Sequence, residues 1–174
     1  MNRKDKSPGF TLVELTVIVA VIGIIVAIAG GYNAKFFLWR KIDSVTGGVA
    51  NALQTTKLSA ARYGVEFDTT FDQTSDTLDL VIHRGDSNTD STIWTTIQTY
   101  QVDLDPTIVI SKLPSGNRLE FNPTGTSSSD SFIVIPKDTN NFKRCGHVTL
   151  SSLGRISVVK GNWDGTDCNQ IKDQ

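Results

Sequence analysis

The chain has 174 residues, with 17 Lys or Arg and 18 Asp or Glu, so its formal net charge is −1. A chain with this balance is a poor candidate for binding nucleic acid through bulk positive charge. Its length leaves room for one small domain besides a membrane helix.

An apolar stretch over residues 10–31 is the first feature in chain order, and Glu14 is its only formal charge. As a helix, this stretch is long enough to span about 30 Å of hydrocarbon, so we expect residues 10–31 to form a transmembrane helix. Arg3, Lys4 and Lys6 precede it. The positive-inside rule therefore places the N-terminus in the cytoplasm and exports everything after the helix.

Three interpretations of this stretch compete. A cleaved secretory signal requires a shorter apolar core and a small-x-small site, for which Ala27-Ile28-Ala29 is a weak match. A plain signal anchor leaves the Glu14 carboxylate unpaired in lipid, at a cost of about 2.5–3.5 kcal/mol. A cut between Gly9 and Phe10 creates an ammonium group on Phe10, which could neutralise Glu14 within one helix or between subunits.

The residues behind the third interpretation resemble a known family. Gly9-Phe10-Thr11-Leu12-Val13-Glu14-Leu15, after a basic leader, is similar to the processing site of type IV prepilins and type II secretion pseudopilins. The resemblance implies that residues 1–9 are a leader peptide, that an inner-membrane prepilin peptidase cuts between Gly9 and Phe10, and that Phe10 is N-methylated. It also implies that the mature helices assemble into a fibre, with Glu14 guiding subunit docking.

The helical pattern continues over residues 32–64. Apolar residues recur there at spacings of three and four, which is typical of a helix with one buried stripe. Gly47 and Gly48 weaken the helix locally, and Gly64 is a suitable C-cap. A helix over 10–63 would be about 80 Å long, too long for a domain of this size, so its first half needs other partners. The stripe consists of Ile42, Val45, Val49, Leu53, Ala60 and Ala61.

From Val65 onward the apolar period changes to two, and turn-rich breaks separate short segments. Eight strands behind one helix define an α+β fold, with a long N-terminal helix packed on antiparallel β-sheets. Residues 65–174 would then form one β-rich exported domain. The expected strands cover residues 65–67, 77–82, 92–100, 107–110, 118–121, 131–135, 147–150 and 155–159.

Three segments of this second half narrow the resemblance. They are Leu53 through Ala61, Phe121-Asn122-Pro123-Thr124-Gly125, and Val148 through Val158 with its Gly154-Arg155 turn. Together they resemble the GspH/FimT branch of minor pseudopilins and minor pilins. The resemblance implies a pilin-like fold in which the helix leads into two sheets.

Cys145 and Cys168 both lie in the predicted exported domain. Exported cysteines in an even number are most simply interpreted as one disulfide, which for a loop of this length would contribute about 3 kcal/mol. A metal site is the rival interpretation, but it would require histidines at ligand spacing, which are missing.

The sequence offers little for catalysis. His83 and His147 each stand at the end of a predicted strand without a neighbouring acid–nucleophile pattern. Asp86, Asn88 and Asp90 alternate as in a calcium loop, but the glycine and final glutamate of that motif are missing. Hydrolase, zinc-protease and phosphate-loop motifs are also missing. We therefore interpret the mature protein as a non-enzyme without cofactor or metal.

The main hypothesis is a minor structural subunit of a type IV pilus or a type II secretion pseudopilus. The resemblance implies that its partners are other pilin or pseudopilin subunits, the prepilin peptidase and an assembly platform. It further implies a single-pass protein of the bacterial inner membrane, with its C-terminal domain in the periplasm until assembly.

Two rival hypotheses remain. One is a FimT-like minor pilin that binds DNA during uptake, through a thin set of cations. The other is a membrane-anchored receptor domain that never assembles, for which Glu14 would be dispensable. The possible DNA contacts are Lys143, Arg144, Arg155 and Lys160.

Overall fold

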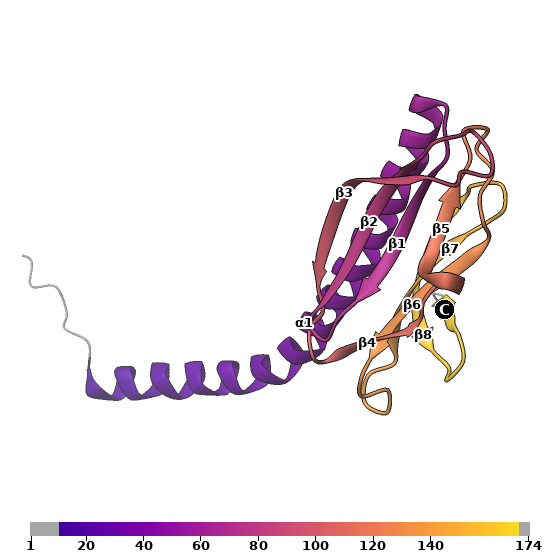
Figure 1. Cartoon of the computed structure of the whole chain (residues 1–174). Helices are drawn as coiled ribbons and strands as arrows, with labels where there is room; N and C mark the ends of the chain where they lie inside the picture. The colour runs from indigo at the N-terminus through magenta and orange to yellow at the C-terminus, as the bar shows by residue number, and fades with distance from the viewer. Residues whose placement is uncertain (1–10, 171–174) are drawn as a thin grey trace, which may run out of the picture. The chain divides into compact units, whose positions relative to one another are not determined.

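The computed structural model describes residues 11–170, apart from the side chains of residues 28–34 and 170. Helix α1 (Leu12–Tyr63) comes first, and nine strands follow it within the described residues (Figure 1). The chain divides into two compact units between Phe37 and Leu38. The first part of α1 (residues 12–37) belongs to one unit, and the second part of α1 (residues 38–63) belongs to the other.

The first part of α1 exposes every side chain described from Leu12 to Ala27. Among the described residues, no helix is long and apolar enough to cross a membrane. Phe10 and the side chains of residues 28–31 lie outside the described residues. The transmembrane helix over residues 10–31 therefore stays a prediction.

The second part of α1 buries one apolar stripe, as the sequence predicts. Ile42, Val49 and Leu53 are completely buried, whereas Ala61, at the end of the predicted stripe, is exposed. The helix ends at Tyr63, and Gly64 follows it with a positive φ of 69°. The Gly64 amide donates to the Ala60 carbonyl oxygen at 3.0 Å, which is the helix end expected of a C-cap glycine.

The strands form two antiparallel sheets. The four-stranded sheet has the order β3-β2-β1-β5, and the five-stranded sheet has the order β4-β6-β7-β8-β9. A single 3₁₀ turn, η1 (Ser115–Asn117), precedes β5. The strands are β1 (Phe67–Gln73), β2 (Thr77–Gly85), β3 (Trp94–Asp103), β4 (Ile108–Lys112), β5 (Arg118–Phe121), β6 (Asp130–Pro136), β7 (Arg144–Leu150), β8 (Ile156–Trp163) and β9 (Cys168–Gln170).

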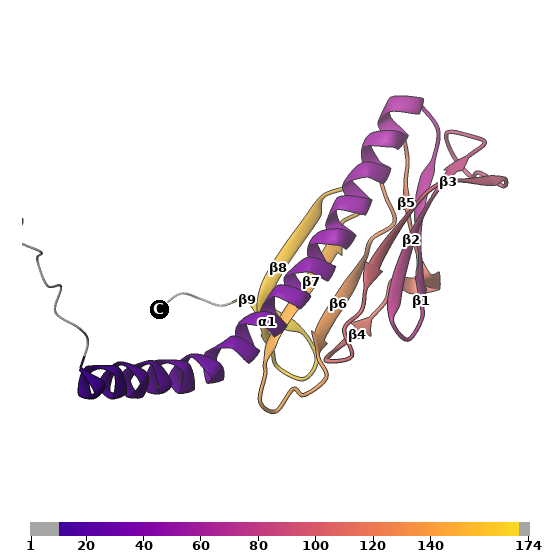
Figure 2. The ribbon, with the colours of Figure 1, turned by 90° about the vertical axis from the view of Figure 1, so that its left-hand side faces the viewer.

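One hydrophobic core joins the second part of α1 to both sheets (Figure 2). Phe71 of β1 stacks on Phe132 of β6 with ring centroids 6.0 Å apart, so the two sheets meet in this core. Its largest members besides these two rings are Phe67, Phe121, Ile42, Leu53, Leu78, Leu80, Ile82 and Leu119. The architecture confirms the predicted α+β fold with a long helix on antiparallel sheets.

A smaller cluster lies apart from this core and contains the disulfide. Cys145 of β7 and Cys168 of β9 are bonded, with Cα atoms 5.7 Å apart. Both are buried, together with Ile133 and Ile135 of β6. The bond confirms the predicted pairing and ties the short strand β9 to the middle of its sheet.

Buried threonines fix how closely α1 approaches the strands. The Thr46 hydroxyl donates to the Ile42 carbonyl oxygen at 2.6 Å, so it needs no water inside the core. It also faces Gly146 of β7, where an added Cβ would overlap it. About three turns further along α1, the hydroxyls of Thr56 and Thr69 lie 2.6 Å apart and link the helix to β1.

Two strand predictions are wrong. The strand expected over residues 65–67 begins only at Phe67 and runs to Gln73. Its continuation was missed because Asp68 interrupts the apolar pattern, although Asp68 is buried and contacts His83 and Arg118. Strand β9 was not expected at all. Its three residues show no apolar alternation, and they are held by pairing with β8 and by the disulfide.

We predict that Gly146→Ala destabilises the domain by about 1–3 kcal/mol, because the new methyl group overpacks against Thr46. Denaturant unfolding of the purified full chain in detergent, followed by circular dichroism, measures the effect. Gly47→Ala is the matched control. Nothing lies within 4 Å of a Cβ at that position, so there the better helix propensity of Ala should stabilise by up to about 1 kcal/mol. Equal effects of the two substitutions would contradict the proposed overlap.

Candidate functional site

Thr11 and Glu14 form a capping box at the start of α1. The Thr11 amide and the Thr11 hydroxyl each donate to Oε2 of Glu14 at 3.1 Å. The Glu14 amide in turn donates to the Thr11 hydroxyl oxygen at 3.3 Å. This reciprocal pattern satisfies donors that a helix start leaves open, and a carboxylate there is favoured by the helix dipole.

The capping box was missed in the sequence, although the spacing of Thr11 and Glu14 matches its motif. Among residues 11–170, Glu14 makes no ion pair, and no hydrogen bond reaches its Oε1. Gly9 and Phe10, the predicted processing residues, lie outside the described residues. Their cleavage and methylation, and the pairing of Phe10 with Glu14, stay predictions.

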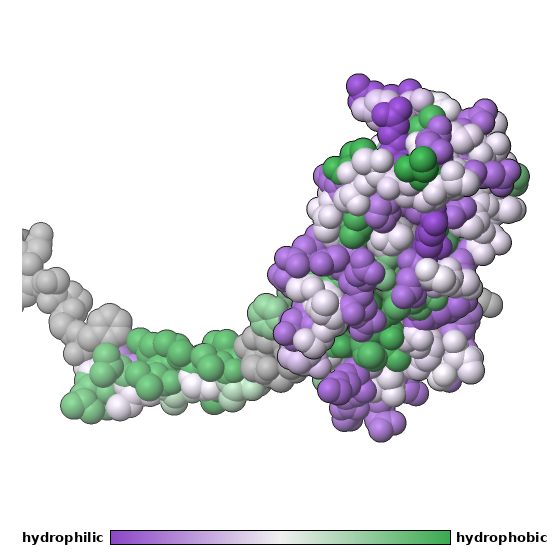
Figure 3. Space-filling model, viewed as in Figure 1, coloured by the Kyte–Doolittle hydropathy of each residue, from purple (hydrophilic) through white to green (hydrophobic). Residues whose placement is uncertain are grey.

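From Leu12 to Ala27, helix α1 is apolar on all sides rather than along one stripe. Exposed fractions run from 79% at Leu12 to 44% at Ile18, and Val26 is still 63% exposed. Figure 3 shows the resulting apolar surface. The Thr16 hydroxyl donates to the Val13 carbonyl oxygen at 2.8 Å, so it does not need water. A helix of this kind requires either lipid or other helices around it.

Cations and acids are paired close to the start of the second part of α1. The Lys41 ammonium contacts the Asp105 carboxylate, and Lys160 of β8 lies 3.2 Å from Asp43. These contacts bring α1 together with the β3–β4 connection and with β8.

The four possible DNA contacts do not form one patch. Lys160 is paired with Asp43, and the guanidinium of Arg144 lies 5.0 Å from the centre of the Trp39 ring. Arg155 follows the β7–β8 turn, at the opposite end of these strands from Arg144 and Lys143. Six residue steps along β7 separate the two ends, about 20 Å.

The two turns that carried the resemblance to the GspH/FimT branch lie against each other. Gly154 has a φ of 66°, and a Cβ there would overlap the Gly125 carbonyl oxygen. The Lys57 ammonium of α1 donates to the Gly154 carbonyl oxygen at 2.8 Å. The Ser127 amide donates to the Ser152 carbonyl oxygen at 3.0 Å. These motif residues therefore join α1 to the β5–β6 connection and to the β7–β8 turn, which is a structural role.

Each histidine has a carboxylate partner that the sequence did not reveal. His83 Nδ1 lies 2.7 Å from Oδ1 of Asp68, whose other oxygen contacts Arg118. Burial raises the pKa of Asp68, while Arg118 and His83 oppose the shift. The Arg118 guanidinium lies 4.0 Å from the Trp94 ring centre. The cluster joins β1, β2, β3 and β5 on one face of their sheet.

His147 Nδ1 lies 3.3 Å from Asp167. Burial lowers the pKa of His147, and Asp167 partly opposes that shift. Neither histidine is part of a metal site within the described residues, where no group of three or more His, Cys, Asp or Glu could hold an ion. Both pairs are cross-links between elements of the β-rich domain.

The alternating Asp86, Asn88 and Asp90 form a closed loop. The Thr92 and Ile93 amides donate to Oδ1 of Asp86 at 3.0 and 3.2 Å. The Ile93 amide is the main cause that lowers the pKa of Asp86. Asp86 thus closes the loop that leads into β3 by binding amides.

Comparisons with known proteins agree with this arrangement. Residues 4–30 match the family described as the prokaryotic N-terminal methylation motif. The fold is similar to that of the minor pseudopilin EpsH from the type 2 secretion system of Vibrio cholerae, with a TM-score of 0.51 and 15% sequence identity. The match covers 68% of this chain and 96% of that chain. No curated protein matches the sequence. The chain therefore carries this N-terminal motif and has a fold similar to that of this minor pseudopilin.

We predict that the free energy of unfolding of the Asp105→Asn variant falls less between pH 4 and pH 2 than that of the parent chain. Hydrogen bonds from Lys41 and Thr107 lower the pKa of Asp105 to about 2. Because this pKa lies below its usual value of 3.8, the contact contributes stability above about pH 4 and loses it as the pH falls towards 2. At neutral pH the substitution should cost no more than about 1 kcal/mol.

Denaturant unfolding of the full chain at pH 5, 4, 3 and 2 measures this effect. Asp72→Asn is the matched control, since Asp72 is exposed and makes no ion pair within the described residues. If Asp105→Asn loses stability between pH 4 and 2 as steeply as the parent chain, Asp105 is not responsible.

Proposed function

We propose that this chain is a minor structural subunit of a type IV pilus or a type II secretion pseudopilus. The observation that carries the proposal is the first part of α1, an uncovered apolar helix with one carboxylate at its start. The match of residues 4–30 to the methylation motif and the pseudopilin-like fold support the same function.

In this proposal residues 10–31 lie in the inner membrane as a single span, with the C-terminal domain in the periplasm. Prepilin peptidase removes residues 1–9 and methylates Phe10. The helix then leaves the bilayer on the assembly platform and packs among the helices of neighbouring subunits. Burying its apolar surface there contributes cohesion of about 25 cal/mol per Å².

Glu14 sets the register of this packing. Its Oε2 accepts the hydrogen bonds of Thr11, and its Oε1 accepts no hydrogen bond within the described residues. We infer that Oε1 receives the ammonium group of Phe10 from the adjacent subunit. One carboxylate would then both cap its own helix and pair with the next one, which offsets the cost of a charge away from water.

The geometry favours the two rival functions less. A DNA-binding role would use Lys143, Arg144, Arg155 and Lys160 as one surface, but Arg155 lies far from the others and Lys160 is already paired. A receptor that never assembles gives the carboxylate of Glu14 no task beyond capping. A structural subunit needs no catalytic group, and the proposal assigns none.

Mass spectrometry of the native protein tests the processing step. We predict that the mature chain begins at Phe10 with a methylated amine. A chain that still begins at Met1 in cells with an active peptidase would falsify the proposal. Gly9→Ala should leave the leader in place, whereas Ser7→Ala, in the same leader, should not.

Fibre recovery tests the role of Glu14. Glu14→Gln keeps the hydrogen bonds of a capping box, in which Gln serves as well as Glu, but it removes the charge. We predict that Glu14→Gln is processed normally yet is recovered in fibres at least tenfold less often, because the Phe10 ammonium then lacks its partner.

Thr11→Ala is the matched control, since it removes the cap and keeps the charge. Immunoblotting of sheared fibres and of membranes compares the two variants with the parent. The carboxylate acts only as a cap if Glu14→Gln enters fibres as well as the parent does. The same conclusion holds if Thr11→Ala, rather than Glu14→Gln, is the variant that is lost from fibres.

A further inference from the structure

The two sheets have four edge strands, and three of them are short or carry charge. Strand β9 has three residues, β5 has four including Arg118 and Glu120, and β4 has five with an irregular register before Lys112. Strand β3 differs, because it runs for ten residues with neither a proline nor a charge before Asp103. Long uncharged edges are the ones that pair with other chains.

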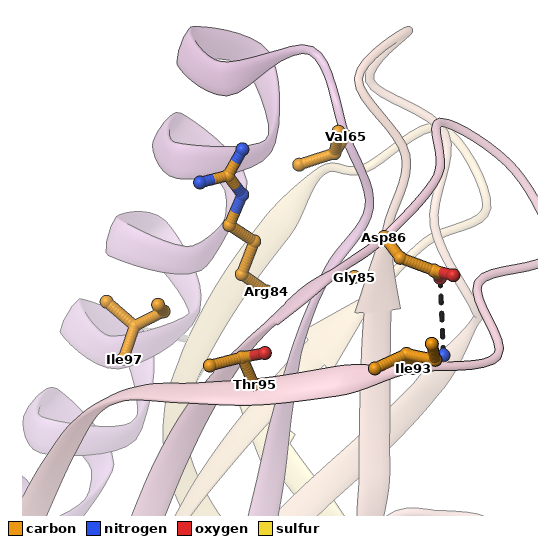
Figure 4. Close-up of a pocket in the computed structure, with 7 residues that line it drawn as sticks. All are labelled: Val65, Arg84, Gly85, Asp86, Ile93, Thr95 and Ile97. Carbon is orange, nitrogen blue, oxygen red and sulfur yellow. Dashed lines mark hydrogen bonds between the residues drawn. The ribbon is translucent and has the colours of Figure 1, made fainter.

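One end of β3 borders a cavity of about 290 Å³ (Figure 4). Two apolar side chains in its wall are largely exposed, Ile93 at 66% and Ile97 at 56%. Ile97 is the extra residue of a bulge opposite Ile82 and His83, and bulges re-aim side chains. The hydrogen bond from the Ile93 amide to Asp86 holds the other wall. The volume suits one or two side chains rather than a cofactor.

Two guanidinium groups lie at the same end of the domain. Arg62 and Arg84 approach the Tyr63 ring, with Cζ 5.5 and 5.4 Å from its centre. Arg84 also lines the cavity. Within residues 11–170, neither arginine forms an ion pair with a carboxylate, and Asp86 binds the Thr92 and Ile93 amides. Guanidinium groups bind carboxylates with two hydrogen bonds when one is offered.

We propose that this surface, defined by Arg62, Tyr63, Arg84, Ile93 and Ile97, docks an extended segment of a partner protein. The segment lies along β3, inserts an apolar side chain between Ile93 and Ile97, and presents a carboxylate to the arginines. The two guanidinium groups favour a partner segment with a carboxylate. The long uncharged edge of β3 favours a segment whose backbone is extended. The proposal goes beyond assembly through α1 and does not depend on it.

A displayed library of random seven-residue peptides, selected on the purified full chain in detergent, tests this proposal. We expect the enriched peptides to combine an Asp or Glu with a nearby apolar residue. A synthetic peptide with the enriched sequence should bind at least tenfold more weakly to the Arg62→Gln/Arg84→Gln variant, because its carboxylate then loses charged hydrogen-bond donors. Ile97→Thr should also weaken binding, and added salt should lower the affinity.

A second cavity supplies the matched control. It measures about 280 Å³ and is lined by Val109 of the edge strand β4 and by Lys137, among others. Val109→Thr/Lys137→Gln should leave peptide binding unchanged. The proposal is overturned if no peptides are enriched, if they lack a carboxylate, or if the arginine variant binds them as well as the parent. Binding of a single-stranded DNA oligonucleotide in place of the peptides would overturn it too.

Discussion

The contact of α1 with both sheets is the constraint on which the rest of the structure depends. The Thr46 hydroxyl donates its hydrogen bond to the backbone of its own helix, so β7 can pack closely against it at Gly146. The Thr56 hydroxyl does the same for β1. Because the hydroxyls of Thr46 and Thr56 already have hydrogen-bond partners, the second part of α1 can lie in one continuous core with both sheets. From Leu12 to Ala27, by contrast, every side chain of the same helix is exposed.

The exposed surface of α1 from Leu12 to Ala27 offers few kinds of chemical group. Along the first part of α1, the Thr16 hydroxyl is satisfied by the Val13 carbonyl oxygen, and Thr11 is satisfied by Glu14. From Leu12 to Ala27, what is left for a neighbour is apolar area and the Glu14 carboxylate. Apolar area is non-directional, so it supplies cohesion without fixing where the next helix lies. A charged hydrogen bond has both position and direction, which is why the proposed assembly assigns the register to Glu14.

Much of this arrangement follows from the sequence, for definite reasons. The stripe at Ile42, Val49 and Leu53 has the helical period, and Gly64 has the residue type that a helix end requires, so both were predictable. Cys145 and Cys168 had no other partners. Cross-strand charges were not predictable, because the contact between Asp68 and Arg118 depends on the order β1-β5, which no local pattern encodes. Strand β9 was missed for the same reason, since its register comes from β8 and the disulfide.

The close contact between the Gly125 and Gly154 turns limits where the chain can accept inserted residues. Backbone atoms meet there, and Lys57 closes the contact from α1. An inserted residue in either turn would disrupt this backbone contact and its link to the helix. The turn over residues 138–141 bonds to itself, with the Asp138 carboxylate accepting from both amides of Asn141. Inserted segments, whether acquired by natural drift or added as an epitope tag, should therefore be tolerated in the turn over residues 138–141. In the Gly125 or Gly154 turn they should destabilise the fold.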